Sequence, residues 1–536
     1  MTATVRARIV LSTLATSLLL AGASCGGGAA AARGGGSLPV VVPVRELDAA
    51  SDAPHVSHVR DLGPPVPLPN GALAHARSDG KFTIGEYVLV EGDDFGKLPT
   101  VLIGGRPARV LARTEGGGIV TQIPTGVTGG ATTVEVSHPA GRHQVSIDVT
   151  RYAIVLDAVS GAVHFLAIAG ADAHPVTSFK MQRPERVRFS ADGAWAYLVS
   201  PSFDSKGDPK NPDVGQVAVL STIALTAEGG PAVVHSTRVP AGPTVALALA
   251  GKLLVLVDGS SLHVFALDEP ETTAPYNRFP LAPDIAAVGP VAADLSPDGQ
   301  RLALLTANNA VTFYSLANPG TPEQLATVPL LPGKRLPLVR DLRFDAAGTL
   351  WIVAGDSQKS LAVGHSSTQL IRIDAAAGAA PRAVDVAGAG PPLAVTPAPR
   401  ESLKSATTIG DTAGDLPIFV TSIDQKLMAA PTTTASTGAI VASLAEPGQV
   451  VRTDSAGRGG PLKALPGVVA GVIALTPDAT LLLATAWSFV GGGDAARFGV
   501  WISGVGADAA PRFVELSGGA PAGYLPQTLG DIAIQP

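Results

Sequence analysis

Residues that could do chemistry are sparse and dispersed along this chain of 536 residues. The ten histidines show no zinc-like spacing, and a single cysteine, Cys25, excludes a cysteine-rich metal site. No phosphate-binding glycine loop ending in Gly-Lys-Ser/Thr is present. From its motifs we therefore predict no catalytic residue and no cofactor.

One acidic loop carries ligand types that calcium prefers. It supplies four side-chain oxygen donors in a short stretch, namely Asp204, Asp208, Asn211 and Asp213. Their spacing is not that of an EF-hand, and two interleaved lysines would repel a cation. The composition favours a solvated loop, with a weak calcium site as the alternative.

Four tryptophans could in principle offer flat surfaces for stacking against sugars. They are Trp195, Trp351, Trp487 and Trp501, and all lie in or near strand patterns. Packing between sheets is therefore the expected role for these side chains.

The first residues indicate export. Arg6 and Arg8 precede the apolar run Ile9–Ala23, which is shorter than an ordinary membrane span. Met1–Ser24, followed by Cys25, resembles a bacterial lipoprotein signal, although the usual large aliphatic residue three places before the cysteine is absent. The resemblance implies an acylated Cys25 and a lipid anchor in the cell envelope, expected in the outer membrane. A plain secretory signal with an incidental cysteine is the alternative.

Residues 25–79 are rich in glycine, alanine and proline and have no steady hydrophobic period. Such a composition is typical of a flexible or extended tether. We predict that this segment separates the folded part of the chain from the membrane.

Residues 80–150 have the pattern of a small antiparallel sandwich. Short β-branched runs alternate with Gly and Pro clusters. The runs are Tyr87–Val90, Thr100–Ile103, Gly118–Ile123 and Thr132–Val136. Together with Glu91–Gly96, the Gly104-Gly105 pair and Gly129-Gly130, they resemble the IPT/TIG family of immunoglobulin-like domains. That resemblance implies a spacer or binding module.

From residue 151 to residue 536 one unit recurs, an apolar strand, a tight turn rich in Asp and Gly, and a second apolar strand. Gly289–Leu316 gives its clearest form, with a third strand at the end. Six copies begin at Val187, Val245, Ala293, Asp341, Leu393 and Ile473. One such unit cannot bury both of its faces, so the copies must stack. The motif resembles the YVTN and WD-like repeats of β-propellers.

The two ends of this domain predict how the ring closes. Tyr152–Leu156 and Val163–Ala169 look like outer strands without an inner one, whereas Leu529–Pro536 matches an inner strand. We predict that the C-terminal strand completes the first blade, which gives about seven blades. The fold class is therefore all-β, an Ig-like sandwich followed by a roughly seven-bladed propeller.

Composition limits the function classes. A net charge of −6 and no downstream basic cluster argue against nucleic-acid binding. The favoured interpretation is a non-enzymatic envelope lipoprotein whose propeller binds an unidentified envelope protein or glycan. The alternative is a propeller hydrolase, lactonase or lyase with its site at the channel mouth. The inner strands are expected to be small and neutral, which disfavours that alternative.

Overall fold

Short strands joined by glycine-rich turns make up nearly all of the regular structure. The computed structural model describes residues 41–42, 52–62, 65–67, 73–75, 80–114, 116–203, 216–225, 230–267, 276–330, 338–355, 368–374, 379–386, 392–397, 418–422, 449–453, 459–463, 465, 468–488, 496–505, 509–520 and 530–536. The part of the chain from Val40 to Pro536 forms one unit by its internal contacts.

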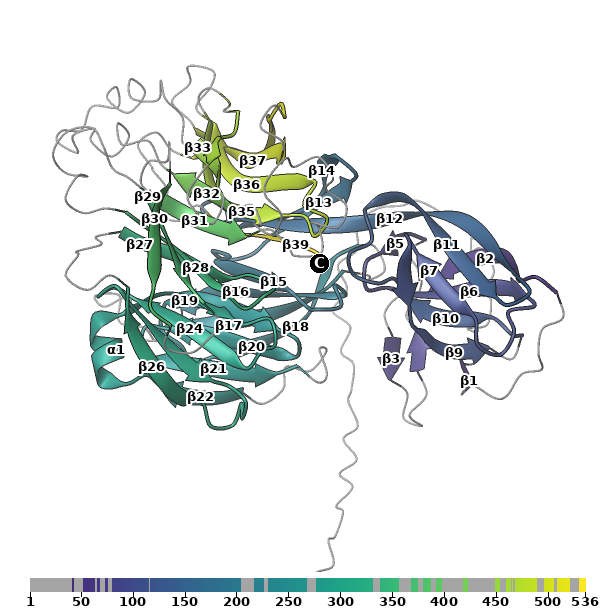
Figure 1. The fold of residues 1–536 in the computed structure, drawn as a ribbon, viewed down its shortest axis with the longest axis horizontal. Coiled ribbons are helices and arrows are strands. Elements are labelled where there is room, and N and C mark those ends of the chain that lie inside the picture. Colours follow the sequence, from purple (N-terminus) through teal and green to yellow (C-terminus); the bar gives the residue numbers. More distant parts are fainter. Residues whose placement is uncertain are drawn as a thin grey trace, which may run out of the picture. The chain divides into compact units, whose positions relative to one another are not determined.

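The first domain is a sandwich of two sheets (Figure 1). One sheet has the order β1-β9-β10-β6-β2, and the other contains β8, β7, β11, the first part of β12 and, beside it, β5. The bounds are β1 Val41–Val42, β2 His55–Asp61, β5 Phe82–Thr83, β6 Tyr87–Asp93, β7 Thr100–Ile103, β8 Arg106–Ala108, β9 Val110–Thr114, β10 Ile119–Gln122, β11 Gly130–His138 and β12 Gly141–Asp157.

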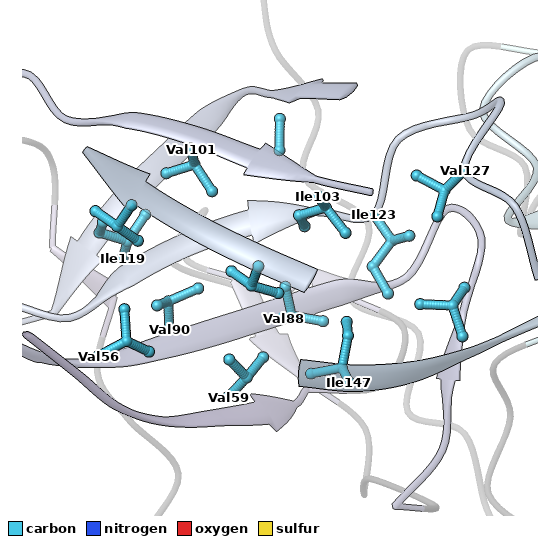
Figure 2. Close-up of a cluster of buried hydrophobic side chains, with 14 of the residues drawn as sticks. Val56, Val59, Val88, Val90, Val101, Ile103, Ile119, Ile123, Val127 and Ile147 are labelled. Carbon is cyan, nitrogen blue, oxygen red and sulfur yellow. The ribbon is translucent and has the colours of Figure 1, made fainter. Parts of the chain in front are cut away.

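The core of the sandwich consists mainly of β-branched side chains from both sheets (Figure 2). Val88 and Ile119 come from one sheet, Ile103 and Val134 come from the other, and all four are fully buried. Burying a side chain of this size stabilises the fold by about 1.5–3 kcal/mol. The Gly104-Gly105 pair forms the turn between β7 and β8 with φ of 57° and 74°.

The sandwich begins earlier than the sequence analysis expects. Strand β2 belongs to the segment assigned to a tether, yet it pairs antiparallel with β6. Val56 and Val59 of this strand are buried in the sandwich core. A second hairpin, β3 Pro65–Pro67 with β4 Leu73–His75, lies in the same segment. The tether boundary at residue 79 is therefore wrong, because alternation over a single strand was hidden by the surrounding prolines.

Six further sheets each contain four consecutive antiparallel strands (Figure 1). Their bounds are β15 Arg186–Phe189, β16 Trp195–Phe203, β17 Gln216–Ala224 and β18 Ala232–Val239; β19 Thr244–Ala250, β20 Leu253–Asp258, β21 Ser261–Ala266 and β22 Tyr276–Pro280; β23 Pro290–Leu295, β24 Arg301–Thr306, β25 Ala310–Ser315 and β26 Glu323–Pro329; β27 Leu338–Phe344, β28 Leu350–Gly355, β29 Thr368–Ile373 and β30 Arg382–Val386; β31 Pro392–Pro397, β32 Ile418–Ser422, β33 Gln449–Thr453 and β34 Gly459–Pro461; and β35 Val468–Leu475, β36 Leu481–Ser488, β37 Ala496–Gly504 and β38 Arg512–Ala520. These sheets are the six repeats that the sequence predicts.

The seventh blade joins the two ends of the domain. Its strands are β39 Ile532–Ile534, the second part of β12, β13 Ala162–Ala169 and β14 Asp172–Lys180. In it, Ala153 of β12 pairs with Ile534 and Val155 pairs with Ile532. The inner strands contact one another in the order β15, β19, β23, β27, β31, β35, β39 and then β15 again. The ring is thus closed by the C-terminal strand, as predicted.

Gln535 connects this closing strand to its surroundings. Its side chain is fully buried. The amide Nε2 donates to the carbonyl oxygens of Ile84 at 2.9 Å and Gly193 at 2.6 Å, and Oε1 accepts the N–H of Tyr152 at 2.8 Å. One amide therefore satisfies backbone groups of the sandwich, the first propeller strand and the turn before β16.

The first turn of the blades repeats one hydrogen-bond arrangement. Ser190 Oγ donates to Asp192 and accepts the N–H of Trp195, and Gly193 takes a φ of 77°. The same arrangement holds the turn between β23 and β24, where Ser296 bonds to Asp298 and Arg301. Positive φ explains the recurrent glycine, since a Cβ is strained there.

One helix, α1 Pro283–Val288, precedes β23 in the described residues. This short helix is a local exception within the all-β fold. Its six residues make fewer than two turns and are too few to produce a helical hydrophobic period, although proline at the start is typical of a helix. No helix in the described ranges combines the length and hydropathy of a membrane span.

Asp258 organises the turn between β20 and β21. Its Oδ1 accepts the N–H groups of Ser260 and Ser261, and its Oδ2 lies 3.0 Å from Nε2 of His263. Both side chains of the Asp258–His263 pair are fully buried. Burial alone would raise the pKa of Asp258, but hydrogen bonds from His263 and from backbone N–H groups outweigh it and lower the pKa to about 2.

This lowered pKa makes stability depend on pH. The ordinary aspartate pKa is about 3.9, so Asp258 stabilises the fold above pH ~4, and the contribution is lost as the pH falls toward 2. We predict that Asp258→Asn lowers the free energy of unfolding by on the order of 2 kcal/mol at pH 7, and that the difference shrinks between pH ~4 and ~2. Urea unfolding over a pH series measures it. Asp93→Asn, at an exposed position, is the control, and a difference that stays constant with pH would contradict the prediction.

Candidate functional site

The site residues suggested by the sequence fall outside the described residues. This applies to the lipid-anchor candidate Cys25 and to the weak calcium candidates Asp204, Asp208, Asn211 and Asp213. Both assignments stay predictions. Within the described residues, no group of three or more His, Cys, Asp or Glu side chains is arranged to hold a metal ion.

All four tryptophans have buried side chains, with exposed fractions between 3% and 8%. Trp487 is packed in one buried cluster with Leu166 of the neighbouring blade, and Trp195 is packed in another with Leu254 of the blade that follows it. The predicted packing role is therefore confirmed.

The inner strands bring six charged side chains together at the propeller axis. We call this set the axial charge cluster, and it consists of Arg186, Arg188, Asp294, Asp341, Arg343 and Asp531. These residues come from β15, β23 and β27 and from the position just before β39. Charges on opposite sides of the ring interact, since Arg343 helps to set the pKa of Asp531. The cluster is the candidate functional site.

The acidic members of the cluster bond to the neighbouring inner strand. Asp531 accepts the N–H of Val187 in β15 at 3.0 Å, and Asp294 accepts the N–H of Phe344 in β27 at 2.9 Å. In the same way, Asp341 of β27 accepts the N–H of a residue of β31 at 3.2 Å. These carboxylates therefore link consecutive blades directly at the axis.

Two arginines of β15 add to these links. Arg188 Nη1 lies 2.8 Å from Asp531 Oδ2 and also donates to the carbonyl oxygen of Val187. The guanidinium of Arg186 donates from Nε and Nη2 to the carbonyl oxygen of Val245 in β19. Since hydrogen bonds to charged groups stabilise a fold by about 1.5–3 kcal/mol each, the cluster is a substantial part of the ring's stability.

The pKa values of two carboxylates in the axial charge cluster are shifted in opposite directions. Burial would raise the pKa of Asp531, but Arg188, Arg186 and Arg343 outweigh burial, so this pKa lies below its ordinary value. Burial does raise the pKa of Asp341, although Arg343 opposes it. For Arg343, burial would lower the pKa, but the nearby carboxylates outweigh it and raise the pKa.

The axial charges correct the expectation of small, neutral inner strands for β15, β23 and β27. Three of the repeats contain charged residues in the inner-strand sequence, for example Arg188 before Phe189 and Asp341 before Leu342, whereas the inner strands β19, β31 and β35 contain none. The sequence does not reveal how these residues are arranged in space, because alternation along one inner strand does not show which side chains meet across the ring. A charge recurring at inner-strand positions of several repeats was the signal available.

No protein-family model and no curated protein matches the chain. Among solved structures, a candidate 6-phosphogluconolactonase from Bacteroides uniformis aligns with a TM-score of 0.46 and 14% identity, over 72% of this chain and 99% of that chain. A candidate 6-phosphogluconolactonase from Bacteroides fragilis gives 0.46 and 12%, over 72% and 98%. The β-propeller domain of Myceliophteria thermophila Cps50 (Swd1) gives 0.39 and 12%, over 63% and 96%. At this level of similarity we draw no functional argument from them.

The pair Arg188–Asp531 allows a direct test of the inter-blade links. Its side chains are 18% and 4% exposed, so removal of one partner leaves a largely buried charge. We predict that Asp531→Ala lowers the free energy of unfolding by about 3–5 kcal/mol. Combining it with Arg188→Met should recover part of this loss, because no unpaired charge then remains. Denaturant unfolding of both single variants and the double variant measures the coupling, and strictly additive losses would contradict the link.

Proposed function

We propose that the protein is a cell-envelope lipoprotein whose propeller acts as a non-enzymatic binding or scaffold module. The observation that carries this proposal is the use of the axial charges. Asp294, Asp341 and Asp531 each accept a backbone N–H of the neighbouring strand. Carboxylates held in this way maintain a shaped binding surface at the centre of the ring, and they are less free to act as an acid and base pair.

The N-terminal sequence supports the envelope part of the proposal. The resemblance of Met1–Ser24 and Cys25 to a lipoprotein signal implies attachment through a lipid, most simply to the outer membrane. The sandwich, which resembles an IPT/TIG domain in sequence, would then act as a spacer or an additional binding module. Its partner is an envelope protein or a glycan.

A second candidate function is a propeller hydrolase, lactonase or lyase. One observation favours it, because burial raises the pKa of Asp341 above its ordinary value, and Asp294 lies in the same cluster. Raised carboxyl pKa values occur at sites of acid catalysis as well as in structural ion pairs. Product formation from lactone or glycan substrates would decide for this alternative.

The lipid anchor has a simple test. We predict that the full chain, expressed in a Gram-negative host with an alkyne-labelled fatty acid, acquires the label and fractionates with membranes. Cys25→Ser should abolish the label and release the protein into the soluble periplasmic fraction, since no other cysteine is present. Labelling of the Cys25→Ser variant, or its unchanged membrane attachment, would contradict the proposal.

The binding function is tested by affinity capture. We predict that the chain starting after Cys25, immobilised and exposed to envelope extract from its source, retains a specific protein or polysaccharide that mass spectrometry identifies. Parallel captures with calcium and with a chelator test the acidic loop 204–213 at the same time. A variant with this loop shortened is the matched control for loop contacts. Empty captures in both conditions would argue against a tight-binding role.

A further inference from the structure

Arg343 differs from the other two arginines of the axial charge cluster. Its Nη1 lies 4.0 Å from Oδ1 of Asp294, and its Nε lies 3.8 Å from Oδ2 of Asp341. Both distances exceed the 2.7–3.2 Å typical of an N–H···O hydrogen bond. The guanidinium attracts both carboxylates without forming a hydrogen bond to either, and it forms none to another residue of the described ranges.

A guanidinium carries five N–H donors in a planar fork. In Arg186 and Arg188, donors are used on backbone carbonyl oxygens and on Asp531. In Arg343 they are not used by the described residues, and the side chain is 23% exposed, so part of the guanidinium is accessible to a small molecule. The flanking carboxylates, Asp294 and Asp341, are also partly exposed, at 17% and 15%.

The charges of Arg343, Asp294 and Asp341 restrict the chemistry of a ligand. An anion would be attracted by Arg343 but would meet two carboxylates, and a cation would meet the guanidinium. A hydroxyl group suits both, because it accepts from an N–H donor and donates to a carboxylate oxygen. Adjacent hydroxyl groups on one ring would satisfy the guanidinium and the carboxylates together. An uncharged polyol therefore fits better than either kind of ion.

We propose that Arg343, Asp294 and Asp341 form a binding site for a neutral sugar residue at the propeller axis. This inference rests on the proposed binding function and specifies its ligand class. Arg343 supplies hydrogen-bond donors to the sugar oxygens, and the two aspartates accept from its hydroxyl groups. Both aspartates keep their backbone bonds through Oδ2, which leaves Oδ1 of each for the ligand.

The test is saturation-transfer NMR on the chain starting after Cys25. Galactose, galacturonate and galactosamine share one ring and differ in charge, so they test charge selectivity directly, and glucose, mannose and N-acetylglucosamine extend the neutral set. We expect saturation transfer to at least one neutral sugar and weaker transfer to its charged counterpart. Arg343→Lys keeps the positive charge but removes the planar fork, and it should weaken the affinity about tenfold.

Arg497→Lys is the matched control, because Arg497 is exposed and pairs with Glu515 on an outer strand. It should leave sugar binding unchanged. Should Arg343→Lys fail to fold, Asp294→Asn provides the second variant, since an asparagine oxygen can still accept the N–H of Phe344. Asp294→Asn should also weaken neutral-sugar binding.

The inference is overturned if no neutral sugar receives saturation, if galacturonate or galactosamine is preferred, or if Arg343→Lys and Arg497→Lys behave alike. Capture of a protein partner without any sugar signal would remove this site but leave the proposed binding function. Conversion of the sugar into a product, visible in the same spectra, would keep the site and overturn the non-enzymatic function.

Discussion

Pairing of β12 with β39 is the contact on which the rest of the propeller depends. Three residue pairs join the start of the domain to its end, and they give the seventh blade its inner strand. Without them, β12 would present an open edge and the contacts of β39 with β15 and β35 would be lost. Each repeat buries its faces only against its neighbours, so a gap at one position removes packing on both sides of that gap.

The axial charge cluster contains paired charges that stabilise the ring and also hydrogen-bonding groups that are partly exposed, and these two properties usually conflict. Buried charges are costly unless paired and hydrogen-bonded, and Arg188 with Asp531 meets that condition. Arg343 meets it only by long-range attraction, which leaves hydrogen-bonding capacity in a partly exposed place. In the proposed sugar site, Asp294 and Asp341 would therefore hold neighbouring blades together through Oδ2 and bind a ligand through Oδ1. In a closed ring every inner strand faces the axis, so residues from different blades can combine both roles there.

Much of the fold could be predicted from the sequence, because each repeat carries its own turn chemistry. Gly193 and Gly299 mark turns that need positive φ, and apolar strands on both sides set the register. The match between residues 529–536 and earlier inner strands was enough to predict ring closure, which the pairing of β39 confirms. Strand β2 could not be found in this way, since a lone strand among prolines has no repeat to compare with. Helix α1 could not be predicted because its six residues make fewer than two turns, too few for a hydrophobic pattern to repeat.

The candidate site was less predictable than the fold. Asp294 and Asp341 lie in separate repeats, and the sequence does not state that they meet Arg343. Only the curvature of the ring brings them together. The ligand candidates that the sequence did offer, such as Asp204, lie in a loop outside the described residues. Local composition thus identifies loops and turns, whereas a site assembled from different blades depends on the closed architecture.

Strand β12 has a mechanical consequence. It runs without interruption from Gly141 to Asp157, pairing first with β11 in the sandwich and then with β13 and β39 in the propeller. A pull on the sandwich along this strand would load the hydrogen bonds to β13 and β39 in shear, so that many bonds share the force at once. A flexible linker would instead let the two domains move apart before any bond was strained. The protein can therefore pass tension from one domain to the other through a single continuous backbone.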